Sequence, residues 1–252
     1  MAMEHNRKVL LLSTSLNDRI IKESFWHESK KKMLGFLSAN NNEIDRSGIE
    51  GLDRILRSNK ISPDIITDYT RVILTNRLEI LLGVEGTKEQ YDLIKEGFLK
   101  IILLANEYYD TVIVDLDRNL GEQITTDILK KSDVVVSIVS QRAKQIQQVE
   151  KQIKEGKVIK ENRSIIAIGR YLEGTKYNAK NITRNILKRK ETINTIPYNN
   201  LFFEATQEGN VVDLFLSFMK IKEKDANYEF VKEVKRLLET IEMQIKISRM
   251  SS

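Results

Sequence analysis

The chain has 252 residues, 41% hydrophobic and 31% charged, which suffices for one sizeable folded core and excludes a disordered polypeptide. Cysteine is absent, which excludes disulfides, thiolate zinc sites and thiol catalysis, and the two histidines are too few for a multi-histidine metal site. The net charge of +5 permits weak attraction to nucleic acid or anionic lipid, although solvated lysines also explain it.

Short β-rich apolar runs alternate with longer amphipathic segments, a rhythm typical of a parallel sheet covered by helices on both faces. In chain order, we expect first a strand at residues 8–13, helices at 18–38 and 47–58, and strands at 71–74 and 77–82. A helix capped by Thr87 and reaching 106 follows, then a strand at 111–116, a helix at 124–130 and a strand at 133–139. The remaining elements are a helix at 143–155, a strand at 164–168, a helix at 179–190, a strand at 192–196 and a helix at 228–247. The predicted fold class is therefore α/β.

The predicted domain organisation is one α/β domain at residues 1–225, followed by an amphipathic helix within residues 226–252 that packs on it. An apolar stripe along this helix supports packing, and it consists of Phe230, Val234, Leu237, Leu238, Ile241 and Ile245. The same tail also has the composition of an amphipathic membrane anchor, but the stripe favours packing. No apolar run approaches the ~20 residues that cross a bilayer, and no secretory signal opens the chain, so we expect a cytoplasmic protein without a membrane partner.

Four segments, in order along the chain, carry a family resemblance. They are RLEILLG at residues 77–83, YYDTVIVDLD at 108–117, TDILKKSDVVVSIV at 126–139 and TIPYNNLFFEATQEG at 195–209. They resemble the "LdvLpG", "YDxVIID", "iL..aD.vvvV" and "IPyd..v..A...G" segments of the ParA/MinD superfamily of ATPases, particularly its divergent TadZ/CpaE-like members. The resemblance spans about residues 8–215 and implies a P-loop NTPase-like fold with a mostly parallel sheet.

The resemblance also implies functional residues. Asp115 matches the Walker B acid, which would hold Mg²⁺ through its hydration shell, and it ends a buried strand where α/β proteins bind ligands. Arg170, Pro197, Tyr198 and Asn199 match positions that flank the nucleotide base. The implied cofactors are ATP and Mg²⁺. In an alternative interpretation, Asp115 caps the loop after its strand, and Pro197 and Tyr198 only end a strand and pack a loop.

Three departures from the family pattern argue against catalysis. No phosphate-binding GxxxxGK[ST] motif occurs in the 252 residues, so the first P-loop strand is also missing from the expected sheet. The family's acidic "DxDpq" is replaced by residues 13–17 (STSLN), and its base-contacting "NR" by Gly169-Arg170. Either the natural protein carries the loop upstream, or this is a degenerate relative that has given up hydrolysis and uses no cofactor. In both cases we expect weak or absent ATPase activity.

A basic segment follows the predicted strand at 164–168. Residues 170–190 contain seven basic side chains and a single acid, Glu173. Within it, the predicted contacts to DNA phosphates are Lys180, Arg184, Lys188, Arg189 and Lys190. A solvated helix face is the alternative, because no aromatic side chain in this predicted helix is available to stack on bases.

Two functions follow from these observations. The first is a homodimeric positioning or assembly factor that recruits a protein partner of a pilus or secretion system, with nucleotide as a switch at most. The second is a plasmid or chromosome partition ATPase that binds DNA without sequence preference.

Overall fold

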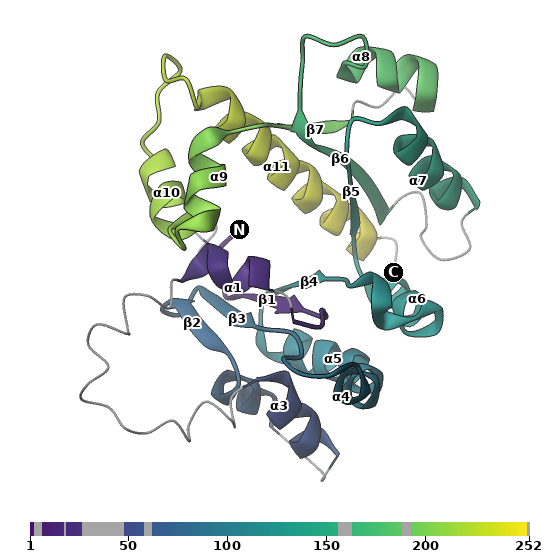
Figure 1. Ribbon diagram of the computed structural model, residues 1–252, viewed down its shortest axis with the longest axis vertical. Coiled ribbons are helices and arrows are strands. Elements are labelled where there is room, and N and C mark those ends of the chain that lie inside the picture. Colours follow the sequence, from purple (N-terminus) through teal and green to yellow (C-terminus); the bar gives the residue numbers. More distant parts are fainter. Residues whose placement is uncertain are drawn as a thin grey trace. The chain divides into compact units, whose positions relative to one another are not determined.

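Two β-sheets form in the computed structural model, which describes residues 1–2, 7–17, 19–26, 48–57, 62–155, 163–187 and 193–250 (Figure 1). The chain divides into two units, each containing one sheet. The first unit comprises Met1–Asp127 and Ala205–Val212, and the second comprises Ile128–Glu204 and Asp213–Ser252. The proposed division at residue 225 stays a prediction.

The sheet of the first unit has the strand order β2-β3-β1-β4. β1 (Val9–Ser13) is central and runs parallel to both β3 (Leu78–Leu81) and β4 (Thr111–Asp115). β2 (Arg71–Leu74) is antiparallel to β3, because a tight turn with Asn76 at φ 59° reverses the chain between them. The continuous apolar run of β1 is what a strand buried on both faces requires.

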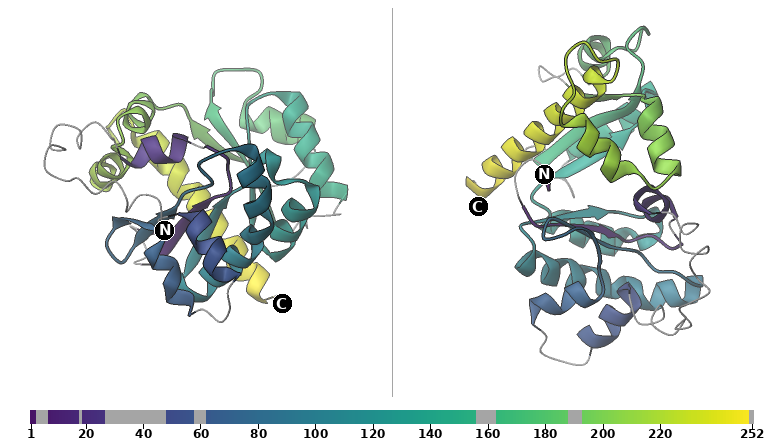
Figure 2. Two further views of the ribbon diagram at one scale, coloured as in Figure 1. Left: turned by 60° about the horizontal axis from the view of Figure 1, so that its bottom comes forward. Right: turned by 90° about the vertical axis from the view of Figure 1, so that its left-hand side faces the viewer.

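Helices α3 (Ile49–Leu56), α4 (Lys88–Ile94) and α5 (Phe98–Tyr108) cover one face of this sheet (Figures 1 and 2). Thr87 caps α4 in a capping box with Gln90, as predicted. The predicted helix from Thr87 to 106 is interrupted by a 3-10 turn at Lys95–Gly97. A side chain at Gly97 would collide with the Asp53 carboxylate of α3, so a glycine is needed where α3 and the start of α5 approach. The unit also contains α1 (Arg19–Phe25) and most of α6 (Glu122–Lys131).

The second unit has three parallel strands in the order β5-β6-β7, namely β5 (Val135–Val139), β6 (Ser164–Tyr171) and β7 (Asn194–Pro197). Helix α7 (Ala143–Glu155) and a π-helical turn at Ile182–Leu187 pack on one face through a cluster that includes Ile146, Ile166 and Ile182. Helix α11 (Tyr228–Met250) lies across the other face (Figure 1). Thr195 of β7 donates a hydrogen bond to Glu233 of α11 over 3.1 Å.

An aromatic cluster joins α11 to the helices that precede it, α9 (Asn200–Gln207) and α10 (Val211–Phe218). Phe202, Phe215, Phe218 and Phe230 form a chain of ring contacts with centroids 5.5–6.1 Å apart. Such contacts bury large apolar surfaces and therefore fix the N-terminal part of α11 on its unit. None of the described helices is long and apolar enough to cross a membrane.

All seven predicted strands are present, and the α/β fold class is confirmed. Three details of the prediction need correction. The strand ending at 168 continues to Tyr171, because Tyr171 still pairs with Pro197. The helix expected at 179–190 is a single turn, α8 (Ala179–Asn181), followed by the π-helical turn. The helix expected at 18–38 is observed as α1, and residues 18 and 27–38 lie outside the described part.

A buried carboxylate, Glu79 of β3, stabilises the end of the first unit's sheet at which β1 and β4 begin. Glu79 is 5% exposed and accepts hydrogen bonds from Thr70 (2.7 Å) and Tyr109 (2.6 Å), while the Lys8 ammonium lies 3.4 Å away. Burial alone would raise the pKa of Glu79, but the two hydrogen bonds and the Lys8 charge outweigh it and hold this pKa below its ordinary value. Burial and the bond to Glu79 raise the pKa of Tyr109, so its hydroxyl remains a donor.

Candidate functional site at the carboxyl edge of β1 and β4

The candidate site lies where β1 and β4 end side by side. The two strands are parallel and in register, so that Ser13 pairs with Asp115 as the last residue of each. The carboxyl ends of parallel strands are where α/β proteins place their ligand-binding residues. The Asp115 side chain is exposed at this edge, in the position that the sequence predicts for it. Its role as a Walker B-like residue remains a prediction.

Three consecutive hydroxyl residues, beginning with the last residue of β1, are buried. Ser13 and Thr14 are 0% exposed and Ser15 is 8% exposed. The Thr14 hydroxyl donates to the Asp115 carbonyl over 2.9 Å and accepts a hydrogen bond from the Asp117 N–H over 2.8 Å. The Ser13 hydroxyl donates to the Ser15 hydroxyl over 3.1 Å. The Thr14 hydroxyl therefore connects the end of β1 to the loop after β4, whereas the Ser13 hydroxyl bonds within the triplet.

A buried tyrosine supports this edge from α4. The Tyr91 hydroxyl donates to the Thr14 carbonyl over 2.9 Å, and the residue is 1% exposed. Burial, followed by the charges of Asp117 and Asp92, raises the pKa of Tyr91 to about 12. The group therefore stays protonated and keeps donating at neutral pH. Sequence reasoning assigned Tyr91 only to the apolar face of its helix, since no local pattern reveals a bond to a residue 77 positions away.

The loops after β1 and β3 also run side by side. Val84 donates to the Ser15 carbonyl (2.9 Å) and Asn17 donates to the Val84 carbonyl (2.8 Å). A Cβ at Gly83 would lie well inside 3.0 Å of the Ser15 carbonyl oxygen, which real Cβ atoms essentially never do. Gly83, the last residue of the "LdvLpG"-like segment, is thus required for the close approach of two backbones.

The acids at this edge do not make a complete metal or nucleotide site. The Asp117 carboxylate accepts a hydrogen bond from Asn119 over 2.6 Å and caps the turn at Arg118–Leu120. No group of three or more His, Cys, Asp or Glu side chains able to hold a metal occurs in the described ranges. Asp115 fits a role as a single carboxylate beside a hydrated Mg²⁺. Nucleotide phosphates do not fit, because residues 13–15 offer neither a lysine nor a loop of free N–H donors.

The other predicted nucleotide contacts belong to the second unit, whereas Asp115 belongs to the first. Arg170 is exposed and has φ 51°, a strained conformation for a residue with a side chain, at the point where the β6–β7 register shifts. Pro197 ends β7 and pairs with Tyr171. Within this unit, Arg170 and Pro197 therefore lie at the same carboxyl edge.

Tyr198 and Asn199 follow at the start of α9. Tyr198 is 48% exposed, and its ring centroid lies 6.5 Å from that of Phe203. The Asn199 side-chain oxygen, Oδ1, accepts a hydrogen bond from the Phe202 N–H (2.8 Å), and its side-chain Nδ2 donates to Oδ1 of Asn227 (2.7 Å). Asn199 thus caps a helix and joins it to the start of α11, whereas Tyr198 is exposed beside Phe203. Nucleotide binding by these residues stays a prediction.

The predicted DNA contacts are described only in part. Lys180 in α8 and Arg184 in the π-helical turn are exposed, and Lys188, Arg189 and Lys190 lie outside the described residues. Lys176 adds a third exposed cation to the same stretch.

Comparison with known proteins bears on the fold. No family model matches the chain, and neither does any curated protein. A ParA family ATPase from Chlorobium tepidum TLS is similar in structure, with a TM-score of 0.64 and 18% identity over 86% of this chain and 82% of that one. MinD complexed with Mg-ADP from Pyrococcus horikoshii OT3 has a TM-score of 0.56 and 13% identity over 94% of this chain and 86% of that one. The MinC:MinD cell division protein complex of Aquifex aeolicus gives a TM-score of 0.53 and 16% identity, again over 94% of this chain and 86% of the matched chain.

At these identities the likeness establishes the fold alone. The chain has the α/β fold of ParA and MinD ATPases, with mostly parallel sheets flanked by helices. The resemblance inferred from the four sequence segments is confirmed at this level, while the closer kinship to TadZ/CpaE-like proteins stays a prediction.

Proposed function

We propose that this chain is a ParA/MinD-like positioning or assembly factor with weak or absent ATP hydrolysis. The observation that carries the proposal is the buried triplet Ser13–Thr14–Ser15, which occupies the edge where the family pattern has acids. Hydroxyls engaged with one another and with the loop after β4 cannot supply the negative charge that orients a metal and an attacking water. The triplet instead has a structural role at this edge, because its hydrogen bonds connect the end of β1 to the loop after β4.

A protein partner is the second part of the proposal. The similar MinD of Aquifex aeolicus forms a complex with MinC, which supports a protein-binding role for this fold. We propose that the chain forms a homodimer and recruits a component of a pilus or secretion system, in agreement with the TadZ/CpaE-like sequence segments. Sedimentation of the purified chain would reveal the dimer.

The purified chain is expected to release no phosphate from ATP above the rate of a protein-free control, with or without Mg²⁺. The Asp115→Asn variant should give the same result, because the site lacks a phosphate cradle. A steady-state phosphate-release assay measures both. Glu122→Gln, an exposed acid at the start of α6, is the matched control. Robust hydrolysis that disappears in Asp115→Asn and persists in Glu122→Gln would refute an inactive site.

A specific observation favours a second candidate, a partition protein that binds DNA without sequence preference. Lys176, Lys180 and Arg184 are exposed, and none of them forms an ion pair with an acid in the described part of the chain. Cations that are not neutralised locally can contact DNA phosphates and release counterions.

If this candidate is right, DNA affinity should fall about 40-fold between ~50 and ~200 mM salt for three phosphate contacts. Lys180→Glu combined with Arg184→Glu should weaken binding equally for unrelated sequences and flatten the salt dependence. Filter binding at both salt concentrations measures this. Lys246→Glu, an exposed lysine of α11, changes charge without touching the segment. Salt-insensitive retention, or equal losses in both variants, would exclude DNA binding by this segment.

A further inference from the structure

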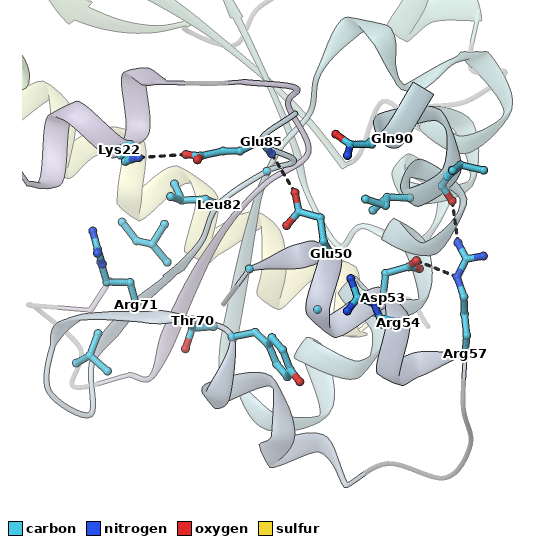
Figure 3. A pocket seen from close by; sticks show the side chains of 18 of the residues that line it. Lys22, Glu50, Asp53, Arg54, Arg57, Thr70, Arg71, Leu82, Glu85 and Gln90 are labelled. Atoms are coloured by element: carbon cyan, nitrogen blue, oxygen red, sulfur yellow. Dashed lines mark hydrogen bonds and ion pairs between the residues drawn. The ribbon is translucent and has the colours of Figure 1, made fainter. Parts of the chain in front are cut away.

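The first unit contains a cavity of about 890 Å³ on the β2 side of its sheet. Its walls come from α1, α3, β2, β3 and α4, all within Met1–Asp127 (Figure 3). Asp115 and residues 13–15 are not among its lining residues.

The acids of the cavity are already engaged. Asp53 pairs with Arg57 over 2.8 Å, and Glu85 pairs with Lys22 over 3.2 Å (Figure 3). Glu50 accepts a hydrogen bond from the Glu85 N–H over 3.0 Å. These contacts neutralise one lysine and one arginine within the wall.

Two arginines of the wall take no part in these ion pairs. Arg54 on α3 and Arg71 on β2 are exposed, and neither forms an ion pair with an acid among the residues that the structure describes. The Arg71 guanidinium stacks on Trp26, with its carbon 4.3 Å from the ring centroid. A stacked guanidinium is held in place while its N–H groups remain available for a carboxylate. The lining has four cationic and three acidic side chains, a net charge of +1, and Arg71 is the cation that stacking holds in place.

The same wall also presents apolar surface and a strand edge. Val72 is 56% exposed and Leu93 is 68% exposed, although both are apolar side chains. β2 is the outermost of the described strands of its sheet, and among them it pairs with β3 alone. An extended peptide can add to such an edge, with main-chain bonds giving affinity and alternating side chains giving specificity.

We propose that this cavity binds an extended segment of a partner protein in which acidic and apolar side chains alternate, laid along the outer edge of β2. Arg71 and Val72 are adjacent in β2 and project to opposite faces of the strand, so the acidic side chains face Arg71 and Arg54 and the apolar ones face Val72. The combination of cations, apolar side chains and a strand edge fits a peptide better than a nucleotide or a polyphosphate, which would use the cations alone. This inference goes beyond the proposed function and requires neither ATP nor DNA.

The experiment uses a reporter built into the cavity. Trp26 is the only tryptophan of the chain, so its fluorescence changes when a ligand meets the Arg71–Trp26 stack. The probe is a synthetic nonapeptide of alternating glutamate and valine, titrated into the full-length chain. Matched peptides carry lysine or glutamine in place of glutamate. A saturable change with the glutamate peptide alone is the expected result.

Two variants test the assignment. Arg54→Ala leaves the reporter stack intact and should weaken binding of the glutamate peptide about tenfold, as loss of a charged hydrogen bond predicts. Arg118→Ala, an exposed arginine outside the cavity, should bind like the wild type. The proposal is overturned if the lysine or glutamine peptide binds equally well, if Arg54→Ala has no effect, or if inorganic phosphate displaces the peptide at equal concentration. Absence of any saturable change up to millimolar peptide overturns it as well.

Discussion

Replacing Gly83 with alanine is expected to lower the free energy of unfolding by about 3 kcal/mol, the upper range for a methyl group forced into a packed interior. The new methyl group would meet the carbonyl oxygen of Ser15, which is backbone and cannot rotate away. The loops after β1 and β3 would have to separate and lose their hydrogen bonds between Val84, Ser15 and Asn17. Urea denaturation followed by circular dichroism measures the change.

Gly174→Ala is the matched control, because a Cβ there meets nothing within 4 Å. It should leave the urea midpoint unchanged or slightly raised, since alanine restricts the unfolded chain more than glycine does. Equal stability of Gly83→Ala and Gly174→Ala would show that the two loops do not approach as closely as described.

Exchanging Glu79 for glutamine is expected to cost about 2–3 kcal/mol at neutral pH, because bonds to a buried charged acceptor are stronger than those to an amide. The variant keeps the size of the side chain but removes the charge that faces Lys8, Thr70 and Tyr109. The loss should also depend on pH. Because the folded-state pKa of Glu79 lies below its ordinary value of 4.5, the ionised group stabilises the fold above that value.

As the pH falls through the folded-state pKa, the wild type loses this contribution, and the stability difference from Glu79→Gln should shrink. Urea titrations at pH 7 and at several values below 4.5 measure the trend. Glu107→Gln, an exposed glutamate of α5, should show neither the cost nor the trend. A pH-independent difference between wild type and Glu79→Gln would mean that the carboxylate is not ionised in the folded protein.

The strands could be predicted from the sequence because each is a short apolar run whose burial follows from its composition. Thr87 and Gln90 predicted a helix start for a similarly local reason, the spacing of a capping box. α9 and α10 were missed, since each has eight residues and shows too little of the helical period. Pro197 lies within β7, rather than after it, because an edge strand needs no N–H on its open side.

The candidate site was less predictable than the fold. The position of Asp115 followed from its place at the end of an apolar strand. The bonds from Thr14 to the Asp115 carbonyl and from Tyr91 to Thr14 join residues 101 and 77 positions apart, and no local pattern encodes them. The cavity beside β2 was missed for the same reason, because its arginines lie on separate elements and only the tertiary fold makes them neighbours.

The outer strands β4 and β5 each present a border at which another strand can pair. Within the described residues each pairs with a single neighbour, and Ile113 and Ile138 are 44% and 76% exposed. Neither strand contains the lysine or proline that commonly blocks unwanted pairing. Two molecules meeting through these borders can therefore extend a sheet from one chain into the next, and crowded preparations are liable to aggregate by the same hydrogen-bond pattern that builds the native fold.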